Sequence, residues 1–256
     1  GIKMIKAVSI LAFWVSFSFC QNDSILQNLI ANRNVDGVIV IKKLGSSELL
    51  ESDSIKAKNE VLPASTFKIA NTLIALDGGY ISLKDTIIWD GKDRGNPQWN
   101  QSHTIRSAFK CSCVWCYEKI EKKIGIKIYN QELERIQYGN ATAGAIDTSF
   151  WLYGDLRISA EQQVDFLERL ISQKLGFKES SYEITEDIMK DIENVDYTIY
   201  AKTGWVGGIG WYVGYVKKEN GCWIFATRLS GVTKDNGLLK TRQEITIEAL
   251  KRLKII

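Results

Sequence analysis

With 256 residues, the chain is long enough for one large domain or two small subdomains. Its apolar content of 45% and charged content of 25% are ordinary for a soluble globular protein. The net charge is +3 and no long basic run occurs, so the sequence predicts no nucleic-acid partner. So long a chain also excludes a small secreted fold stapled by its five cysteines.

The first 20 residues predict a secretory signal peptide. Two lysines precede the apolar run 7–19, which is too short for a membrane span of about 20 apolar residues. Cys20 could carry a lipid anchor, but a bulky residue precedes it where a small one is expected, so ordinary cleavage is the preferred interpretation. Cleavage would remove two of the 33 basic residues and no acidic one, which lowers the net charge to about +1. We therefore expect a periplasmic or secreted domain over 21–256, without stable membrane association.

Beyond this segment, the pattern of apolar residues predicts strands, then helices, then strands and a final helix. In chain order these are two strands within 37–50, helices at 64–77, 105–124 and 159–175, strands at 197–203, 210–216 and 222–229, and a helix at 238–253. The turn at 217–221 predicts a hairpin between the last two strands. This order favours an α+β fold whose sheet takes strands from both ends of the chain, with a helical part inserted between them.

The most informative stretch is Ser-Thr-Phe-Lys at 65–68, at the start of the predicted helix 64–77. Ser65 and Lys68 lie three residues apart, which places a hydroxyl and an amine on one face of a helix. Ser65 would also lie near the helix N-terminus, where backbone N–H groups are free. A hydroxyl with an amine one turn away is a nucleophile with its own base, although this spacing is common and means little alone.

Four further motifs follow, and each has an ordinary structural explanation of its own. Ser-Cys-Val at 112–114 lies in a predicted helix and offers a hydroxyl for proton relay, or simply a helix cap. Lys-Thr-Gly at 202–204 ends a strand and offers a cation and a hydroxyl to a carboxylate, or is a turn with a solvated lysine. Tyr-Gly-Asn at 138–140 and Phe-Trp-Leu at 150–152 would alone be a turn and a core aromatic cluster.

Taken together and in this order, the five motifs resemble the signature of penicillin-recognising serine enzymes. Ser-Cys-Val in place of Ser-Asp-Asn, with Tyr-Gly-Asn and Trp151, is similar to the class D, oxacillinase-type, β-lactamases. The resemblance extends from Pro63 to Arg242. It implies a transpeptidase-like α/β/α sandwich with an antiparallel sheet, and a serine β-lactamase that hydrolyses β-lactam antibiotics and confers resistance.

The resemblance implies that Ser65 is the acylated nucleophile and that Lys68 is its base. A free lysine, with a pKa of about 10.4, is a cation at neutral pH, and burial can lower that pKa by roughly 3–5. A neutral amine can add CO2, and by resemblance we expect Lys68 to be N6-carboxylated, with bicarbonate required and no other cofactor or metal. The Trp151 indole N–H would hold the carbamate, and Val114 and Leu152 would supply dry walls.

By the same resemblance, Ser112 and Lys202 would carry a proton to the β-lactam nitrogen as the ring opens. The backbone N–H groups of Ser65 and Trp205 would form the oxyanion hole. The remaining substrate-binding residues that the resemblance implies are Tyr138, Thr203, Gly204 and Arg242. Arg242 could equally be a solvated arginine on the last helix, whereas at the site its planar guanidinium would bind the substrate carboxylate with two donors.

Three cysteines lie close together at 111, 113 and 116. Cys113 and Cys116 have the Cys-x-x-Cys spacing of redox thiols, but no βαβ unit flanks them. Three thiols without a clear fourth partner make a weak metal site. We expect small core residues instead, with at least Cys113 a buried free thiol.

Several alternatives stay open. A penicillin-sensing receptor domain, which stays acylated, and a penicillin-binding D,D-carboxypeptidase share these motifs. A Ser-His-Asp triad would have to use His103, the single histidine, and is disfavoured. The short segment 204–211 weakens a carbapenemase assignment, and the chain can be a monomer or a homodimer.

Overall fold

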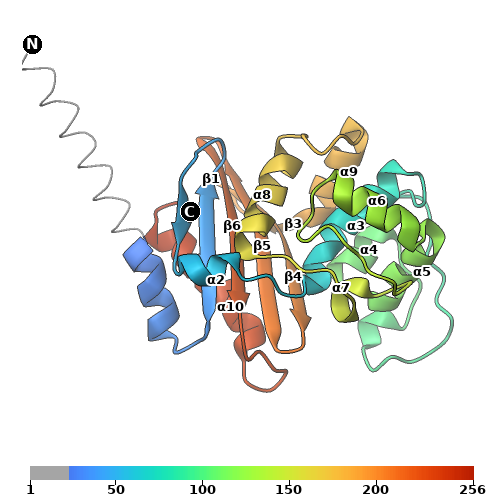
Figure 1. The fold of residues 1–256 in the computed structure, drawn as a ribbon, viewed down its shortest axis with the longest axis horizontal. Coiled ribbons are helices and arrows are strands. Elements are labelled where there is room, and N and C mark those ends of the chain that lie inside the picture. The colour runs from blue at the N-terminus through green and yellow to red at the C-terminus, as the bar shows by residue number, and fades with distance from the viewer. Residues whose placement is uncertain (1–22) are drawn as a thin grey trace, which may run out of the picture.

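The computed structural model describes residues 23–256 of the chain. Within them, six strands form one antiparallel sheet in the order β2-β1-β6-β5-β4-β3 (Figure 1). The strands are β1 (Gly37–Lys43), β2 (Leu49–Glu51), β3 (Lys190–Glu193), β4 (Thr198–Val206), β5 (Ile209–Lys218) and β6 (Gly221–Leu229). β1 pairs with β6 along its whole length, which confirms a sheet built from both ends of the chain.

Helices lie on both faces of the sheet and to one side of it. They are α2 (Ser54–Lys58), α3 (Lys68–Asp77), α4 (Ile105–Lys110), α5 (Val114–Ile124), α6 (Ile126–Arg135), α7 (Phe150–Tyr153), α8 (Ala160–Ile171), α9 (Glu179–Met189) and α10 (Leu238–Arg252), with 3₁₀-helices η1 (Ala64–Phe67) and η2 (Pro97–Trp99) and a helical segment at 23–32. Figure 1 shows α3, α4, α5, α6 and α7 together beyond the β3–β4 side of the sheet. These helices form the inserted helical part that the element order predicts.

The strands bury side chains on both faces of the sheet. In β1, Val38 and Val40 belong to the core that includes α8, whereas Ile39 and Ile41 belong to the core that includes α10. A strand covered on both faces carries a continuous apolar run instead of an alternating one, as β1 does. The predicted α/β/α sandwich is therefore confirmed.

Two of the predicted helices are interrupted close to the motifs. Residues 64–67 form η1, which leads directly into α3, so the helix predicted at 64–77 begins as a 3₁₀-helix. The helix predicted at 105–124 is two helices, α4 and α5, and Ser112 lies in the turn between them with a φ of 57°. The expectation that Ser112 lies inside a helix was wrong, because the Cys113 side chain accepts the Cys116 N–H and so caps a new helix start.

The predicted signal peptide at 1–20 and the Cys20 anchor site lie outside the described residues and stay predictions. Across residues 23–256, every helix is too short or too polar to cross a membrane.

An aromatic cluster anchors η1 to the helical part. The buried Phe67 ring lies 5.2 Å from the ring of Phe150, 5.5 Å from that of Tyr138 and 6.1 Å from that of Tyr129, measured between centroids. All three pairs are tilted or edge-on, the arrangement that aromatic rings prefer. The position of the Ser-x-x-Lys segment therefore depends on this packing.

Replacing Phe67 with alanine should lower the free energy of unfolding by about 3–5 kcal/mol, because it leaves a cavity among three rings. Urea denaturation followed by intrinsic fluorescence measures the change. Tyr153→Ala is the control, since the Tyr153 side chain is largely exposed on α7. Equal unfolding midpoints for Phe67→Ala and the wild type would contradict the anchoring role.

Candidate active site

Ser65 lies in η1 and Lys68 begins α3, so their side chains meet across one turn. The Lys68 Nζ donates a hydrogen bond to the Ser65 Oγ at 3.1 Å. Ala64, directly before Ser65, has a φ of 51°, a left-handed conformation that a non-glycine residue keeps only where its surroundings impose it. Ser65 keeps 8% exposure while Lys68 has none, so a molecule from solvent can touch the serine but not the lysine.

The Lys68 amine is enclosed by aromatic rings. Its Nζ lies 3.8 Å from the centroid of the Trp151 ring and 4.9 Å from that of Tyr117. Burial, followed by the positive charge of Lys202, holds the pKa of Lys68 well below its usual value, and the Glu121 carboxylate opposes this shift. A lysine in these surroundings gives up its proton more easily and can act as a base on the neighbouring hydroxyl.

A buried acid that the sequence motifs did not indicate lies beside this amine. Glu121, in α5, accepts hydrogen bonds from the Trp151 indole N–H, from Asn71 Nδ2 at 3.0 Å and from the Ser149 backbone N–H at 2.7 Å. Burial raises the pKa of Glu121 to about 7, against the lowering effect of its hydrogen bonds. Helix periodicity could have found it, because Glu121 follows the buried Tyr117 by four residues and so shares its face.

A second hydroxyl and amine pair joins the helical part to the sheet. Lys202, in β4, donates from Nζ to the Ser112 Oγ at 2.8 Å and to the Thr203 carbonyl at 3.0 Å. Burial, followed by the charge of Arg242, lowers the pKa of Lys202 to about 7. The structure therefore brings together Ser112 and Lys202, two residues suited to passing a proton near neutral pH.

β4 approaches the nucleophile segment most closely at Gly204. A Cβ at this position would lie 3.1 Å from the Pro63 carbonyl oxygen and 3.2 Å from the Ser65 backbone nitrogen, tighter than ordinary contacts. Glycine permits this approach because it has no Cβ. Trp205 follows directly in β4, so both backbones expected to form the oxyanion hole lie on adjoining segments.

Thr203 and Arg242 line one pocket, a cavity of about 240 Å³ that Lys202 also lines. Arg242, in α10, donates from Nη1 to the Gly204 carbonyl at 2.8 Å, and its buried Nε has no hydrogen-bond partner among the described residues. Burial lowers the pKa of Arg242 to about 10, so the side chain is still a cation at neutral pH. A buried cation with an unused donor suits an anionic group of a ligand.

The three other predicted site residues lie deeper. Val114 is half-buried at the start of α5 and Leu152 is buried in α7, and both pack against the larger apolar core. Tyr138 is fully buried, with its ring 5.5 Å from Phe67 and 4.9 Å from Phe166. The expected substrate contact of Tyr138 was therefore wrong, because this side chain has no exposed surface and instead supports η1.

Comparisons with known proteins agree with this geometry. The model of the penicillin binding protein transpeptidase domain matches residues 37–251. The chain is 38% identical over 225 residues to the β-lactamase OXA-48 of Klebsiella pneumoniae, which covers 86% of this chain and 84% of the relative. The fold is similar to that of the class D β-lactamase YbXI from Nostoc, with 35% identity, a TM-score of 0.85 and coverage of 90% of this chain and 98% of the other. This chain belongs to the class D β-lactamase family.

A second solved structure supports the same assignment. The class D β-lactamase from Sebaldella termitidis is 34% identical, with a TM-score of 0.86 and coverage of 90% of this chain and 96% of the other. Family membership confirms the predicted kind of protein, a serine β-lactamase with the fold of the penicillin-binding transpeptidases. The matched span 37–251 contains both Ser65 and Arg242, so all five motifs belong to one domain.

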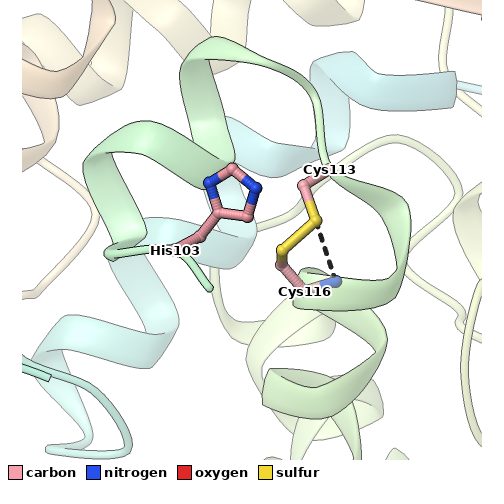
Figure 2. A group of neighbouring side chains, drawn as sticks. All are labelled: His103, Cys113 and Cys116. Atoms are coloured by element: carbon pink, nitrogen blue, oxygen red, sulfur yellow. Dashed lines mark hydrogen bonds between the residues drawn. A yellow bond between two sulfur atoms is a disulfide. The ribbon is translucent and has the colours of Figure 1, made fainter. Parts of the chain in front are cut away.

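Beside Ser112, this class D β-lactamase carries a disulfide between Cys113 and Cys116 (Figure 2). The prediction that Cys113 is a free thiol was wrong. Cys113 caps α5 and Cys116 lies in its first turn, which sets their Cα atoms 5.4 Å apart, a separation that a disulfide spans. Cys111 and Cys222 are the free cysteines of the described chain.

His103 faces the disulfide (Figure 2) but takes no part in the Ser65 site. Its ring nitrogens form hydrogen bonds with the Ser107 Oγ at 2.9 Å and the Gln98 carbonyl at 3.0 Å. The ring and both sulfur atoms lie within 4.8 Å of one another, yet sulfurs joined in a disulfide are not the thiolates that bind a metal. The arrangement favours neither a histidine-based triad nor thiolate ligation.

Replacing Gly204 with alanine should slow acylation of Ser65 by about 10²–10³-fold, the effect of losing an oxyanion-hole donor, because the added Cβ pushes β4 away from the Ser65 backbone. Stopped-flow acylation by benzylpenicillin measures the rate. Gly45→Asn is the control, since a Cβ there meets nothing within 4 Å and asparagine tolerates the φ of 79°. An unchanged acylation rate in Gly204→Ala would refute the close approach.

Removing the disulfide with Cys113→Ala and Cys116→Ala together should lower the free energy of unfolding by about 2 kcal/mol, the loop-closure effect of so short a link. It should also slow acylation, because the turn that carries Ser112 loses its tie. Cys222→Ala, which removes a free cysteine in β6, is the control. Non-reducing peptide mass spectra without a 113–116 link would contradict the structure directly.

Proposed function

We propose that this protein hydrolyses β-lactam antibiotics through an acyl-enzyme on Ser65 and so confers resistance to them. The observation that carries the proposal is the 3.1 Å hydrogen bond between the buried Lys68 amine and the Ser65 hydroxyl, in a chain of the class D family. A hydroxyl is a weak nucleophile at neutral pH unless a neighbouring base takes its proton. The Lys68 Nζ is in contact with the Ser65 oxygen that carries this proton, and its site disfavours the charged form of the amine.

In the first half of the reaction, the Ser65 oxygen bonds to the lactam carbonyl carbon and the ring C–N bond breaks. The base at Lys68 takes the serine proton, and the ring nitrogen gains a proton as it leaves. We assign this second transfer to Ser112 and Lys202, which are joined at 2.8 Å. The backbone N–H groups of Ser65 and Trp205 would stabilise the negative oxygen that forms in between.

We propose that Lys68 is already carboxylated on Nζ, by CO2 drawn from bicarbonate, before the antibiotic binds, and that this carbamate is the base in both halves of the reaction. The carbamate would supply an anionic base that can activate the water that cleaves the acyl-enzyme. Burial supports the modification, since only a neutral amine adds CO2. Val114 and Leu152 would help to keep water away. The fit is incomplete, because the Trp151 N–H expected to hold the carbamate is donated to Glu121.

Binding of the antibiotic would depend on its carboxylate. Thr203 and Arg242 line the same pocket beside Lys202, and Arg242 has an unused buried donor. A hydrogen bond between a cation and a carboxylate is about twice as strong as one between neutral groups. The close approach of Gly204 to the Ser65 backbone would bring a ligand held by this pocket next to the nucleophile segment.

We further propose that the protein works in the periplasm or outside the cell. Residues 1–20 have the pattern of a signal peptide. The Cys113–Cys116 disulfide supports the same location, because disulfides persist in oxidising compartments and are rare in the cytosol.

With nitrocefin and added bicarbonate, the wild-type protein should show sustained turnover, and bicarbonate-free buffer should reduce it. Lys68→Ala should be acylated once or not at all, since a general base contributes about 10²–10⁴-fold in rate. Spectrophotometry follows turnover and intact-mass spectrometry detects the acyl-enzyme. Lys119→Ala, at an exposed position of α5, is the control.

Normal turnover by Lys68→Ala would refute the base assignment. A single stoichiometric acylation of the wild type would indicate a penicillin-sensing domain instead. Cleavage of a D-alanyl-D-alanine peptide without nitrocefin turnover would indicate a carboxypeptidase.

A further inference from the structure

Three donors hold the carboxylate of Glu121 inside the protein. The Trp151 indole N–H and the Asn71 amide, at 3.0 Å, both donate to Oε1, and the Ser149 backbone N–H donates to Oε2 at 2.7 Å. Asn71 is held in turn by the Tyr129 hydroxyl, which donates to its Oδ1 at 2.8 Å. Glu121 has no exposed surface. With three hydrogen-bond donors directed at it, the buried Glu121 carboxylate is well satisfied, as buried polar groups in native proteins are.

The same indole ring serves both Glu121 and Lys68. Its N–H is donated to the Glu121 carboxylate, while its face lies 3.8 Å from the Lys68 Nζ. Asn71 stands three residues after Lys68 on α3, so the donor to the acid and the base come from one helix face. The acid, the indole and the amine therefore form one buried group, drawn from α5, α7 and α3.

The charges in this group are coupled. Burial raises the pKa of Glu121 to about 7, while its hydrogen bonds and Lys68 lower it and Glu118 raises it slightly. For Lys68, burial and Lys202 lower the pKa, while Glu121 and Glu118 raise it. An ionised Glu121 thus favours the ammonium form of Lys68, which cannot react with CO2.

We infer that Glu121 is a positioning residue that opposes carboxylation of Lys68, because its carboxylate occupies the Trp151 N–H and stabilises Lys68 as an ammonium. This inference rests on the proposed function, which requires a carboxylated lysine. A carbamate at Lys68 would place a second anion beside Glu121 and would compete for the same indole donor. Two buried anions around one donor repel each other, so one of them must be protonated.

Carboxylation of Lys68 conserves protons. In net terms, the Lys68 ammonium loses one proton and the Glu121 carboxylate gains one, which makes it a neutral acid. The neutral amine then forms an N–C bond with CO2 and releases its second proton to solvent. One proton leaves the site in total, and Glu121 ends uncharged. Carboxylation must therefore overcome the charge interaction between Glu121 and Lys68.

The test compares Glu121→Gln with the wild type, since glutamine keeps the shape and one acceptor while removing the charge. Glu118→Gln is the matched control, because Glu118 lies one turn earlier on α5 and binds the Ser149 hydroxyl at 2.6 Å without contacting Trp151. Two readouts are taken in parallel across a bicarbonate series. One is the carbamate signal in ¹³C NMR with ¹³C-labelled bicarbonate, and the other is nitrocefin turnover.

Glu121→Gln should reach half-maximal carbamate at about ten-fold lower bicarbonate, because the main negative charge that stabilises the Lys68 ammonium is removed. Glu118→Gln removes a charge with a weaker effect on Lys68, so its bicarbonate requirement should fall by a smaller factor. Asn71→Ala should shift in the same direction by a smaller factor, because it removes one donor from an intact Glu121. This variant keeps the inference testable if Glu121→Gln does not fold.

An equal or higher bicarbonate requirement in both Glu121→Gln and Asn71→Ala would overturn the inference. The two proposals fail separately. Absence of nitrocefin turnover in the wild type at every bicarbonate concentration sinks the proposed function, whereas turnover with a bicarbonate response that is the same in all variants sinks only the role of Glu121.

Discussion

The burial of a single amine, that of Lys68, sets the conditions for everything else at this site. An ammonium in a dry cage of Trp151 and Tyr117 is unfavourable, so the cage pushes the lysine towards its neutral form. The same cage lies against Ser65, and only the serine is reached from solvent. The reactivity of Ser65 therefore depends on the Lys68 amine, which solvent does not reach. Glu121 limits how far the pKa of Lys68 falls, because its negative charge favours the ammonium form.

Local patterns predicted much of the fold and the central part of the site. Alternation and helical periodicity gave the order of strands and helices, since these depend on which face of an element is apolar. The motifs placed Ser65 next to Lys68 and singled out Ser112 and Lys202, and the structure joins each pair by a hydrogen bond. Residues one helical turn apart, such as Ser65 and Lys68, are neighbours wherever a helix forms, so their contact can be predicted from sequence alone. The second pair was available only through the resemblance, because its members lie far apart in the chain.

The features that the sequence did not predict depend on where a side chain points and on contacts with residues far away in the chain. No glycine or proline marks the turn at 111–113, so neither the break before α5 nor the pairing of Cys113 could be inferred from local signals. Periodicity places Glu121 on a buried face, but its donors come from α3 and α7. For Tyr138 the motif indicated the right segment but not the direction of the side chain, which packs against Phe67.

The order of segments along the chain has a consequence for the newly made protein. Ser65 stands in the first third of the sequence, whereas β4, whose Gly204 packs against it, and α10, whose Arg242 binds the Gly204 carbonyl, come much later. β1 also lacks its long partner until β6 has been made. A chain still leaving the ribosome therefore has Ser65 and Lys68 before it has the β4 backbone that packs against Ser65. The surroundings of Ser65 are thus completed only once the C-terminal strands and α10 have been made, although the serine itself is among the earlier residues of the chain.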